Sequence, residues 1–290
     1  MNRTILVTEP TGMLEQEIVR GLRNRGYCVR IAVHYSLEAQ VLSYECPVVS
    51  LDYADLESCR KALKGVKSVF LGLPVMSPRM DDLFLPFMNA ARDEQVEHIV
   101  GLGSIGQGTD SPLMVVEKCI QNCGIDYTLL RPNLYMQHFK NIALPGIRNS
   151  HSIYLPAGDA SISFVDVRDV AAAALESVLD EKHRNRIYTI TGAQALDHYR
   201  IAEILSKVTG RKITYIPVSH NELWDILKES GWDDASTELM IGLYEIARHG
   251  WSEDISPDLS QVIGRSPITF EQFALDHQSE WLPGEGEEKS

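Results

Sequence analysis

The sequence lacks the run of ~18–20 apolar residues that a membrane-spanning helix needs. It also lacks the pattern of a secretory leader, because Met-Asn-Arg-Thr precedes only a short apolar stretch at 5–7. Low-complexity segments are missing too, and only 283–290, which has no apolar side chain, is typical of a frayed tail. We therefore expect a cytoplasmic, globular protein with no membrane partner.

Positive charge is scarce, since 27 Lys and Arg stand against 40 Asp and Glu, for a formal net charge of −13. This balance disfavours binding to a phosphate backbone, so no nucleic-acid partner is expected. The 5 cysteines form an odd set without the pair spacing of a metal site. They predict reduced thiols and no bound metal.

What the sequence does contain is an alternation of short β-branched stretches with amphipathic ones. Strands are predicted at 4–8, 28–33, 48–51, 68–73, 98–102 and 127–130, and helices at 14–25, 55–63, 82–94 and 113–123. Strands linked in this way pair in parallel through right-handed crossovers. The expected fold class is α/β, a Rossmann-like doubly wound parallel sheet that binds ligands at the carboxyl ends of its strands.

From about residue 151 the alternation loosens. Strands are predicted at 161–165, 187–190 and 212–218, and helices at 167–179, 199–208, 222–230, 237–249, 257–264 and 270–281. We interpret 1–150 as a Rossmann-like domain of the NAD(P)-binding type. The smaller, mostly helical lobe at 151–282 shares part of the sheet and is expected to cover the substrate, and 283–290 is the flexible tail.

The first predicted strand runs into a turn, TEPTGMLE at 8–15, at the place of a dinucleotide-binding fingerprint. Here the sequence resembles the NmrA-like branch of the atypical short-chain dehydrogenases, whose turn reads Thr-Gly-Ala-Thr-Gly-x-x-Gly. The resemblance covers nearly the whole chain and includes 96–105, 124–133, 164–171, 201–206 and 270–274. It implies a Rossmann-like fold with a site for NADPH or NADH.

The turn departs from the family pattern, because only Gly12 remains of three glycines and Glu9 and Glu15 replace the other two. The N-terminus of a helix carries partial positive charge and ordinarily receives a phosphate. Carboxylates there take up its N–H donors and repel a diphosphate by about 4 kcal/mol per charge pair ~4 Å apart near a protein surface. We therefore expect an impaired dinucleotide site and no cofactor. The alternative is that both glutamates turn to solvent and the turn still accepts a nucleotide.

The positions at which a dinucleotide would be held are Thr11, Gly12, Met13, His34, Asp52 and Pro74. The resemblance implies an Arg at His34, to meet the adenosine 2′-phosphate, and a neutral imidazole replaces a guanidinium poorly. Asp52 matches a family position that contacts adenine, although an Asp that opens a loop is also common capping chemistry.

The proton donor of related reductases is also missing. The resemblance implies a Lys or His in the helix before the sixth strand, where this chain has Leu113. Ser104 follows the fifth strand, but a serine with no adjacent base more often only makes hydrogen bonds in a site than acts as a catalyst. Glu117 and Lys118, on the same helix as Leu113, are expected to form a solvated pair.

The richest polar cluster follows the sixth predicted strand and comprises Arg131, Asn133, Tyr135, Gln137 and His138. Arg131 can hold a carboxylate or enolate, Tyr135 can donate a proton and His138 can relay one. We take these three with Asn133 and Ser104 as candidate catalytic residues. In the alternative reading the segment only fixes the crossover into the second lobe. The apolar residues around the crevice favour a small hydrophobic or aromatic ligand.

Three functions remain open. The leading hypothesis is an enzyme that lacks ordinary NAD(P)H use and acts on a small hydrophobic or aromatic molecule by non-redox chemistry such as isomerisation, cyclisation or elimination. The first alternative is an NAD(P)H-dependent reductase of quinone-like or imine-like substrates. The second is a non-enzymatic regulator or binding partner.

Overall fold

The computed structural model describes residues 4–33, 45–72, 80–103, 105 and 112–282. The chain forms two compact units. Unit 1 comprises Met1–Pro132, Val167–Ile190 and Asp258–Gly264, and unit 2 comprises Asn133–Asp166, Thr191–Pro257 and Arg265–Ser290. The division at residue 150 stays a prediction. Within the described ranges, no helix has both the length and the apolar character needed to cross a membrane.

Unit 1 is built on a seven-stranded sheet in the order β3-β2-β1-β4-β5-β6-β8, and every pair in it is parallel. Its strands are β1 (Thr4–Thr8), β2 (Cys28–Val33), β3 (Val48–Ser50), β4 (Val66–Leu71), β5 (His98–Leu102), β6 (Asp126–Pro132) and β8 (Arg186–Ile190). The chain starts in the middle of the sheet and winds outward in both directions, which confirms the predicted doubly wound α/β class.

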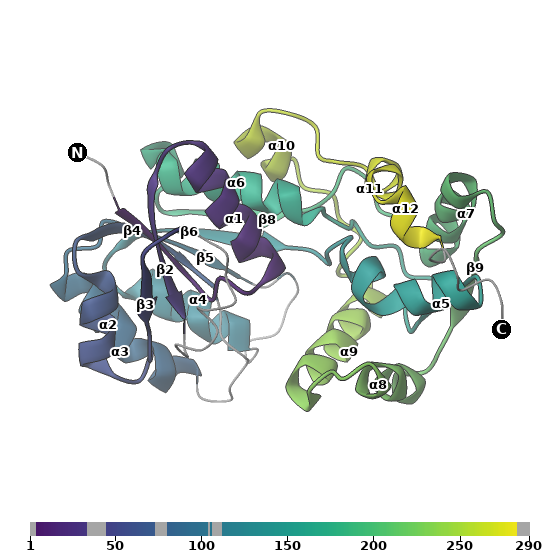
Figure 1. Ribbon diagram of the computed structural model, residues 1–290, viewed down its shortest axis with the longest axis horizontal. Coiled ribbons are helices and arrows are strands. Elements are labelled where there is room, and N and C mark those ends of the chain that lie inside the picture. Colours follow the sequence, from purple (N-terminus) through teal and green to yellow (C-terminus); the bar gives the residue numbers. More distant parts are fainter. Residues whose placement is uncertain (1–3, 34–44, 73–79, 104, 106–111, 283–290) are drawn as a thin grey trace. The chain divides into compact units, whose positions relative to one another are not determined.

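Helices cover both faces of this sheet, with α1 and α6 on one face and α2, α3 and α4 on the other (Figure 1). The helices of unit 1 are α1 (Met13–Asn24), α2 (Leu56–Leu63), α3 (Met80–Asp93), α4 (Pro112–Asn122), α6 (Val167–Leu179), η3 (Glu181–His183) and α10 (Asp258–Ile263). Strand residues alternate between the faces, so that Leu6, Val69 and Ile99 join the core under α2, α3 and α4. Burial on both faces explains the continuous apolar runs of these strands.

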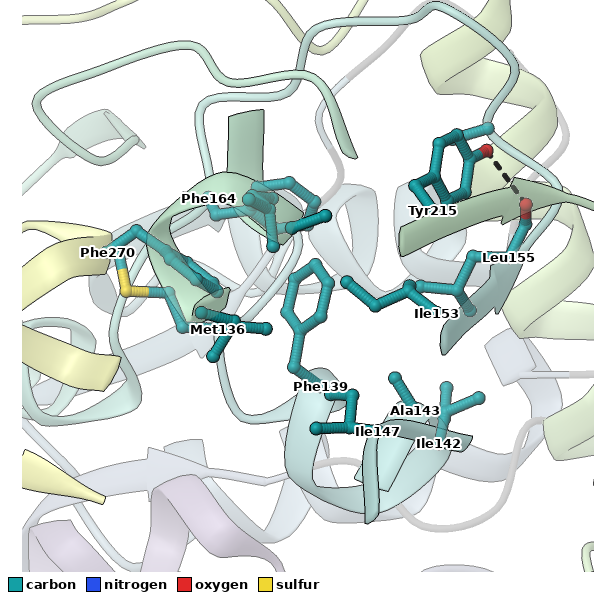
Figure 2. Close-up of a cluster of buried hydrophobic side chains, with 14 of the residues drawn as sticks. Met136, Phe139, Ile142, Ala143, Ile147, Ile153, Leu155, Phe164, Tyr215 and Phe270 are labelled. Atoms are coloured by element: carbon teal, nitrogen blue, oxygen red, sulfur yellow. Dashed lines mark hydrogen bonds between the residues drawn. The ribbon is translucent and has the colours of Figure 1, made fainter. Parts of the chain in front are cut away.

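Unit 2 is mostly helical and has its own core. Its elements are η2 (Phe139–Ala143), α5 (Leu144–Asn149), β7 (Ser152–Leu155), α7 (His198–Thr209), β9 (Thr214–Pro217), α8 (His220–Glu229), α9 (Asp234–Arg248), α11 (Phe270–Asp276) and α12 (Gln278–Trp281). Strands β7 and β9 form a small parallel sheet. Figure 2 shows Phe139 at the centre of the core, with edge-to-face contacts to Phe164 and Phe270 at centroid distances of 5.2 and 5.1 Å.

The structure differs from the predicted elements mainly in unit 2. The strand predicted at 161–165 forms only isolated bridges, because its amides and carbonyls pair with loops, as Ser163 does with Ser252 and Gly192. The helix predicted at 270–281 is interrupted at His277, which leaves helical geometry at φ −112° and ψ 19°. Elements η2, α5 and β7 were not predicted, since their short apolar runs show no clear period.

Candidate functional site

The candidate site lies where the strand order reverses, between β1 and β4. At such a point the two crossovers leave on opposite faces of the sheet and open a crevice at the strand ends. Thr8 ends β1 and donates its hydroxyl to the carbonyl oxygen of Gly72, the residue after β4, at 3.0 Å. A Cβ on Gly72 would lie 2.6 Å from the carbonyl oxygen of Thr8, so only glycine allows the two ends to approach this closely.

The turn after β1 has the backbone geometry of a glycine turn although a glutamate stands in it. Glu9 has φ 52°, in the left-handed region, and its amide donates to Ala32 O at 3.1 Å. The turn closes with the Gly12 amide on Glu9 O at 3.2 Å. Helix α1 then begins with Gly12 as its N-cap, which has no side chain, and the carboxylate of Glu15 accepts a hydrogen bond from its own first-turn amide. The first-turn amides point out of the helix as in a phosphate-binding turn.

The side chain of Glu15 bends back toward the start of α1 and is buried, with an exposed fraction of 8%. Its carboxyl lies between the Cα atoms of Gly12 and Gly72, because a Cβ on either glycine would collide with it. Burial, with a smaller contribution from the charge of Glu9, raises the pKa of Glu15 to about 7. Glu15 is therefore neither the permanently charged carboxylate of the leading interpretation nor the solvent-exposed side chain of the alternative.

The two other described turn positions make local contacts. Thr11 is exposed, and its carbonyl oxygen accepts a hydrogen bond from the side chain of Gln16 at 2.9 Å. Met13, the first residue of α1, has an exposed fraction of 37%. Both residues and Gly12 stay predictions as cofactor contacts.

Asp52 lies beyond β3 and shapes its own loop. Its carboxylate accepts the Ala54 amide at 2.9 Å, while its amide donates to Ser58 Oγ at 2.9 Å. Helix α2 is capped by Asp55 rather than by Asp52. The exposed Asp52 thus supports an Asx-type turn, and its contact with adenine stays a prediction.

Three predicted site residues, His34, Pro74 and Ser104, lie outside the described residues. Their assigned roles stay predictions.

Arg131, on β6, is bound by Glu117 of α4. Both carboxylate oxygens accept from its guanidinium, with Nε donating to Oε2 at 3.1 Å. The side chain of Glu117 has an exposed fraction of 2%, so the expectation that Glu117 forms a solvated pair with Lys118 is wrong. The sequence pattern of α4 did not predict the burial of Glu117, because a carboxylate is rarely buried unless it is paired.

Asn133 is the first residue of unit 2, and its side-chain amide makes hydrogen bonds to other residues of that unit. Its amide nitrogen donates to Ser163 Oγ and to the Ser252 carbonyl oxygen, both at 2.8 Å, and its oxygen accepts the Leu134 amide at 2.9 Å. These bonds hold three separate segments of unit 2 together, and the catalytic role of Asn133 stays a prediction.

Tyr135 and His138 lie close together in unit 2, with ring centroids 5.6 Å apart. Burial lowers the pKa of His138 to about 4, so its imidazole is neutral near pH 7. Gln137 donates to Asp166 at 2.9 Å. The structure thus brings Tyr135 and His138 together, while their catalytic roles stay predictions.

Sequence reasoning missed two residues that pack at this end of the sheet. Gly72 received no role, although a glycine directly after a buried strand is a usable signal of close backbone approach. Tyr53 is fully buried, and its hydroxyl donates to Gly72 O at 3.3 Å. No local pattern identifies Tyr53, because this contact joins segments 19 residues apart in the sequence.

Comparisons with known proteins find relatives along nearly the whole chain. An NAD(P)H azoreductase of Xenophilus azovorans is 28% identical over 280 residues, covering 94% of this chain and 97% of that protein. The crystal structure of the Citrobacter sp. triphenylmethane reductase complexed with NADP(H) matches with a TM-score of 0.83 and 26% identity, over 95% of this chain and 99% of that one. The NADPH complex of an NADPH-dependent quinone oxidoreductase from Escherichia coli matches with a TM-score of 0.82 and 25% identity, over 94% and 99%.

These relatives overturn two expectations. Both the leading hypothesis of non-redox chemistry and the expected lack of a cofactor are wrong, because proteins similar over the full length are reductases named for NAD(P)H or bound to NADP(H). The error has a physical cause at the turn. Glu9 adopts the glycine conformation, and burial keeps Glu15 from being a fixed negative charge.

The family profile confirms the resemblance inferred from the sequence. The profile of the NmrA-like family matches residues 112–274, more than half of the chain. The chain belongs to the NmrA-like family.

Proposed function

We propose that this protein is an NAD(P)H-dependent reductase of small aromatic acceptors such as quinones or azo compounds. The observation that carries the proposal is similarity over 94% of the chain to an NAD(P)H azoreductase. The quinone and triphenylmethane reductases that share its fold support the same class of enzyme. The names of these relatives indicate azo, triphenylmethane and quinone substrates, in keeping with the small hydrophobic or aromatic ligand expected from the sequence.

The turn after β1 fits a dinucleotide. It lies where the strand order of the sheet reverses, Glu9 provides the left-handed turn, and the N-cap Gly12 has no side chain. The first-turn amides after Gly12 would hold the diphosphate, because they combine N–H donors with the positive end of the helix dipole. Asp52 would hold the adenosine end. When bound, the reduced nicotinamide supplies the hydride.

Tyr135 and His138 are our candidates for contacting the acceptor in unit 2. At neutral pH His138 is uncharged, so it can accept or donate one hydrogen bond but cannot balance a negative charge. Tyr135 can donate its phenolic proton. Arg131, Asn133 and Ser104 stay weaker candidates, since Arg131 is held by Glu117 and Asn133 by the fold of unit 2.

The test is cofactor oxidation, followed at 340 nm with NADPH and NADH against a panel of quinones and azo dyes. We expect turnover with at least one class of acceptor, and its loss in Gly12→Asp, which adds bulk and negative charge at the N-cap of α1. Gly242→Ala is the control, because a Cβ there meets nothing within 4 Å. Oxidation at background with every acceptor would refute the proposal, and cofactor binding without turnover would favour a regulator.

A further inference from the structure

The carboxyl of Glu15 occupies the space that Gly12 and Gly72 leave where the strand order reverses, between β1 and β4. A Cβ on Gly72 would lie 2.9 Å from Oε1 of Glu15, and a Cβ on Gly12 would lie 3.0 Å from its carboxyl carbon. The side chain is attached to the first turn of α1, and its carboxylate accepts a hydrogen bond from its own backbone amide. The carboxyl is therefore directed at the same helix end that the proposed diphosphate site uses.

Among the residues that the structure describes, no basic side chain contributes to the pKa of Glu15, and only its own backbone amide favours the ionised carboxyl. From the turn after β1 it meets Glu9, whose negative charge raises the pKa of Glu15 further. Tyr53, from the loop after β3, bonds to Gly72 O, and burial raises the pKa of Tyr53 well above its usual value. Thr8 and Gly72, at the ends of β1 and β4, do not titrate. With its pKa at about 7, Glu15 is neutral in about half of the molecules at pH 7.

We propose that Glu15 is a determinant of cofactor affinity, and that the dinucleotide binds to the form of the protein in which the Glu15 carboxyl is neutral. The inference rests on the proposed NAD(P)H site. A neutral carboxyl has an O–H that donates to a phosphate oxygen, whereas an ionised one only accepts and repels the diphosphate. Binding to a molecule with ionised Glu15 therefore takes up one proton from solvent.

The expected pH dependence follows from the fraction of binding-competent protein. If only the neutral form binds, the apparent Kd rises about tenfold between pH 6 and pH 8, and binding at pH 8 takes up about 0.9 proton. This pH dependence reflects the titration of the buried carboxyl of Glu15 in the unliganded protein. NADH is the better probe, because it lacks the titrating 2′-phosphate of NADPH.

The experiment is calorimetric titration of the full chain with NADH and with NADPH at pH 6 and pH 8. Two buffers of different ionisation enthalpy at each pH give the number of protons taken up. The variants are Glu15→Gln, which keeps the shape of the side chain without its charge, and Glu15→Gly. Glu17→Gln is the matched control on the same helix, since Glu17 pairs with Arg20 at 2.6 Å. Circular dichroism checks that each variant is folded.

We expect the wild type and Glu17→Gln to lose about tenfold in NADH affinity between pH 6 and pH 8 and to take up protons, whereas Glu15→Gln does neither. Equal pH dependence in the wild type and Glu15→Gln would overturn this inference and leave the proposed function intact. Absence of binding in the wild type, Glu15→Gln and Glu15→Gly alike would overturn both.

Discussion

Acid should destabilise the fold of this protein through His98, at the start of β5. The ring has an exposed fraction of 2%, and its Nε2 lies 2.9 Å from Thr128 Oγ1. The only proton of that hydroxyl is donated to the His183 carbonyl oxygen at 2.7 Å. Nε2 of His98 must therefore carry the ring proton, and a second proton on the ring would place a charge in the core of unit 1.

The size of this loss of stability follows from the pKa of His98. Burial, assisted by the charge of Arg184, lowers this pKa from 6.5 to about 4. Between these two values the unfolded chain binds more protons than the folded protein, so the stability contributed by neutral His98 is complete above pH 6.5 and is lost as the pH falls toward 4. Moving from pH 7.5 to pH 5 should cost about 2 kcal/mol through this group alone.

The assay is urea unfolding at pH 7.5 and pH 5.0, with His98→Gln and the wild type compared. Other buried histidines titrate in both proteins, so the difference between their losses isolates His98. The variant is expected to lose about 2 kcal/mol less than the wild type, while His249→Gln, at an exposed site, should behave as the wild type. Equal losses in all three proteins would show that His98 does not cause the loss of stability in acid.

Three further predictions concern stability and are read from urea unfolding. Arg131→Ala should lower the free energy of unfolding by about 3–5 kcal/mol, because it leaves the buried carboxylate of Glu117 uncompensated. Adding Glu117→Gln should restore part of this free energy, and no restoration would contradict the assigned pair. Glu9→Gly should be about 1 kcal/mol more stable than Glu9→Ala, since only glycine takes φ 52° without strain, and the reverse order would contradict the turn geometry. Gly192→Ala should lower the free energy of unfolding by about 1–3 kcal/mol, because its Cβ would overlap a carbonyl oxygen. Gly242→Ala, inside α9, should raise it by about 0.5–1 kcal/mol. Equal effects of the two substitutions would contradict the packing.

The fold of unit 1 could be predicted from local sequence because its signals repeat. The inner strands of the sheet are short β-branched runs that are mostly buried, and the crossover helices have one apolar stripe, so period and order together specify the doubly wound sheet. Unit 2 offers no such repetition. Its core depends on Phe139, Phe164 and Phe270, which come from segments far apart in the chain.

The candidate site was harder to predict than the fold because its chemistry depends on burial. The sequence places Glu15 at the start of α1, but the protonation of its carboxyl depends on Gly72 and Glu9, which only the folded chain brings near it. Arg131 shows the same limit. Its buried partner Glu117 is 14 residues away, and an exposed pair with Lys118 satisfies the helix pattern equally well.

Binding of a nicotinamide dinucleotide at the turn after β1 can be measured by an equilibrium titration with NADPH. Titration at pH 6.5, followed by the fluorescence of the reduced nicotinamide, is predicted to give saturable binding with a micromolar or lower Kd in the wild type. The same titration should show at least tenfold weaker binding in Gly12→Asp. No saturable binding in the wild type, or equal binding in both proteins, would show that this turn is not a dinucleotide site.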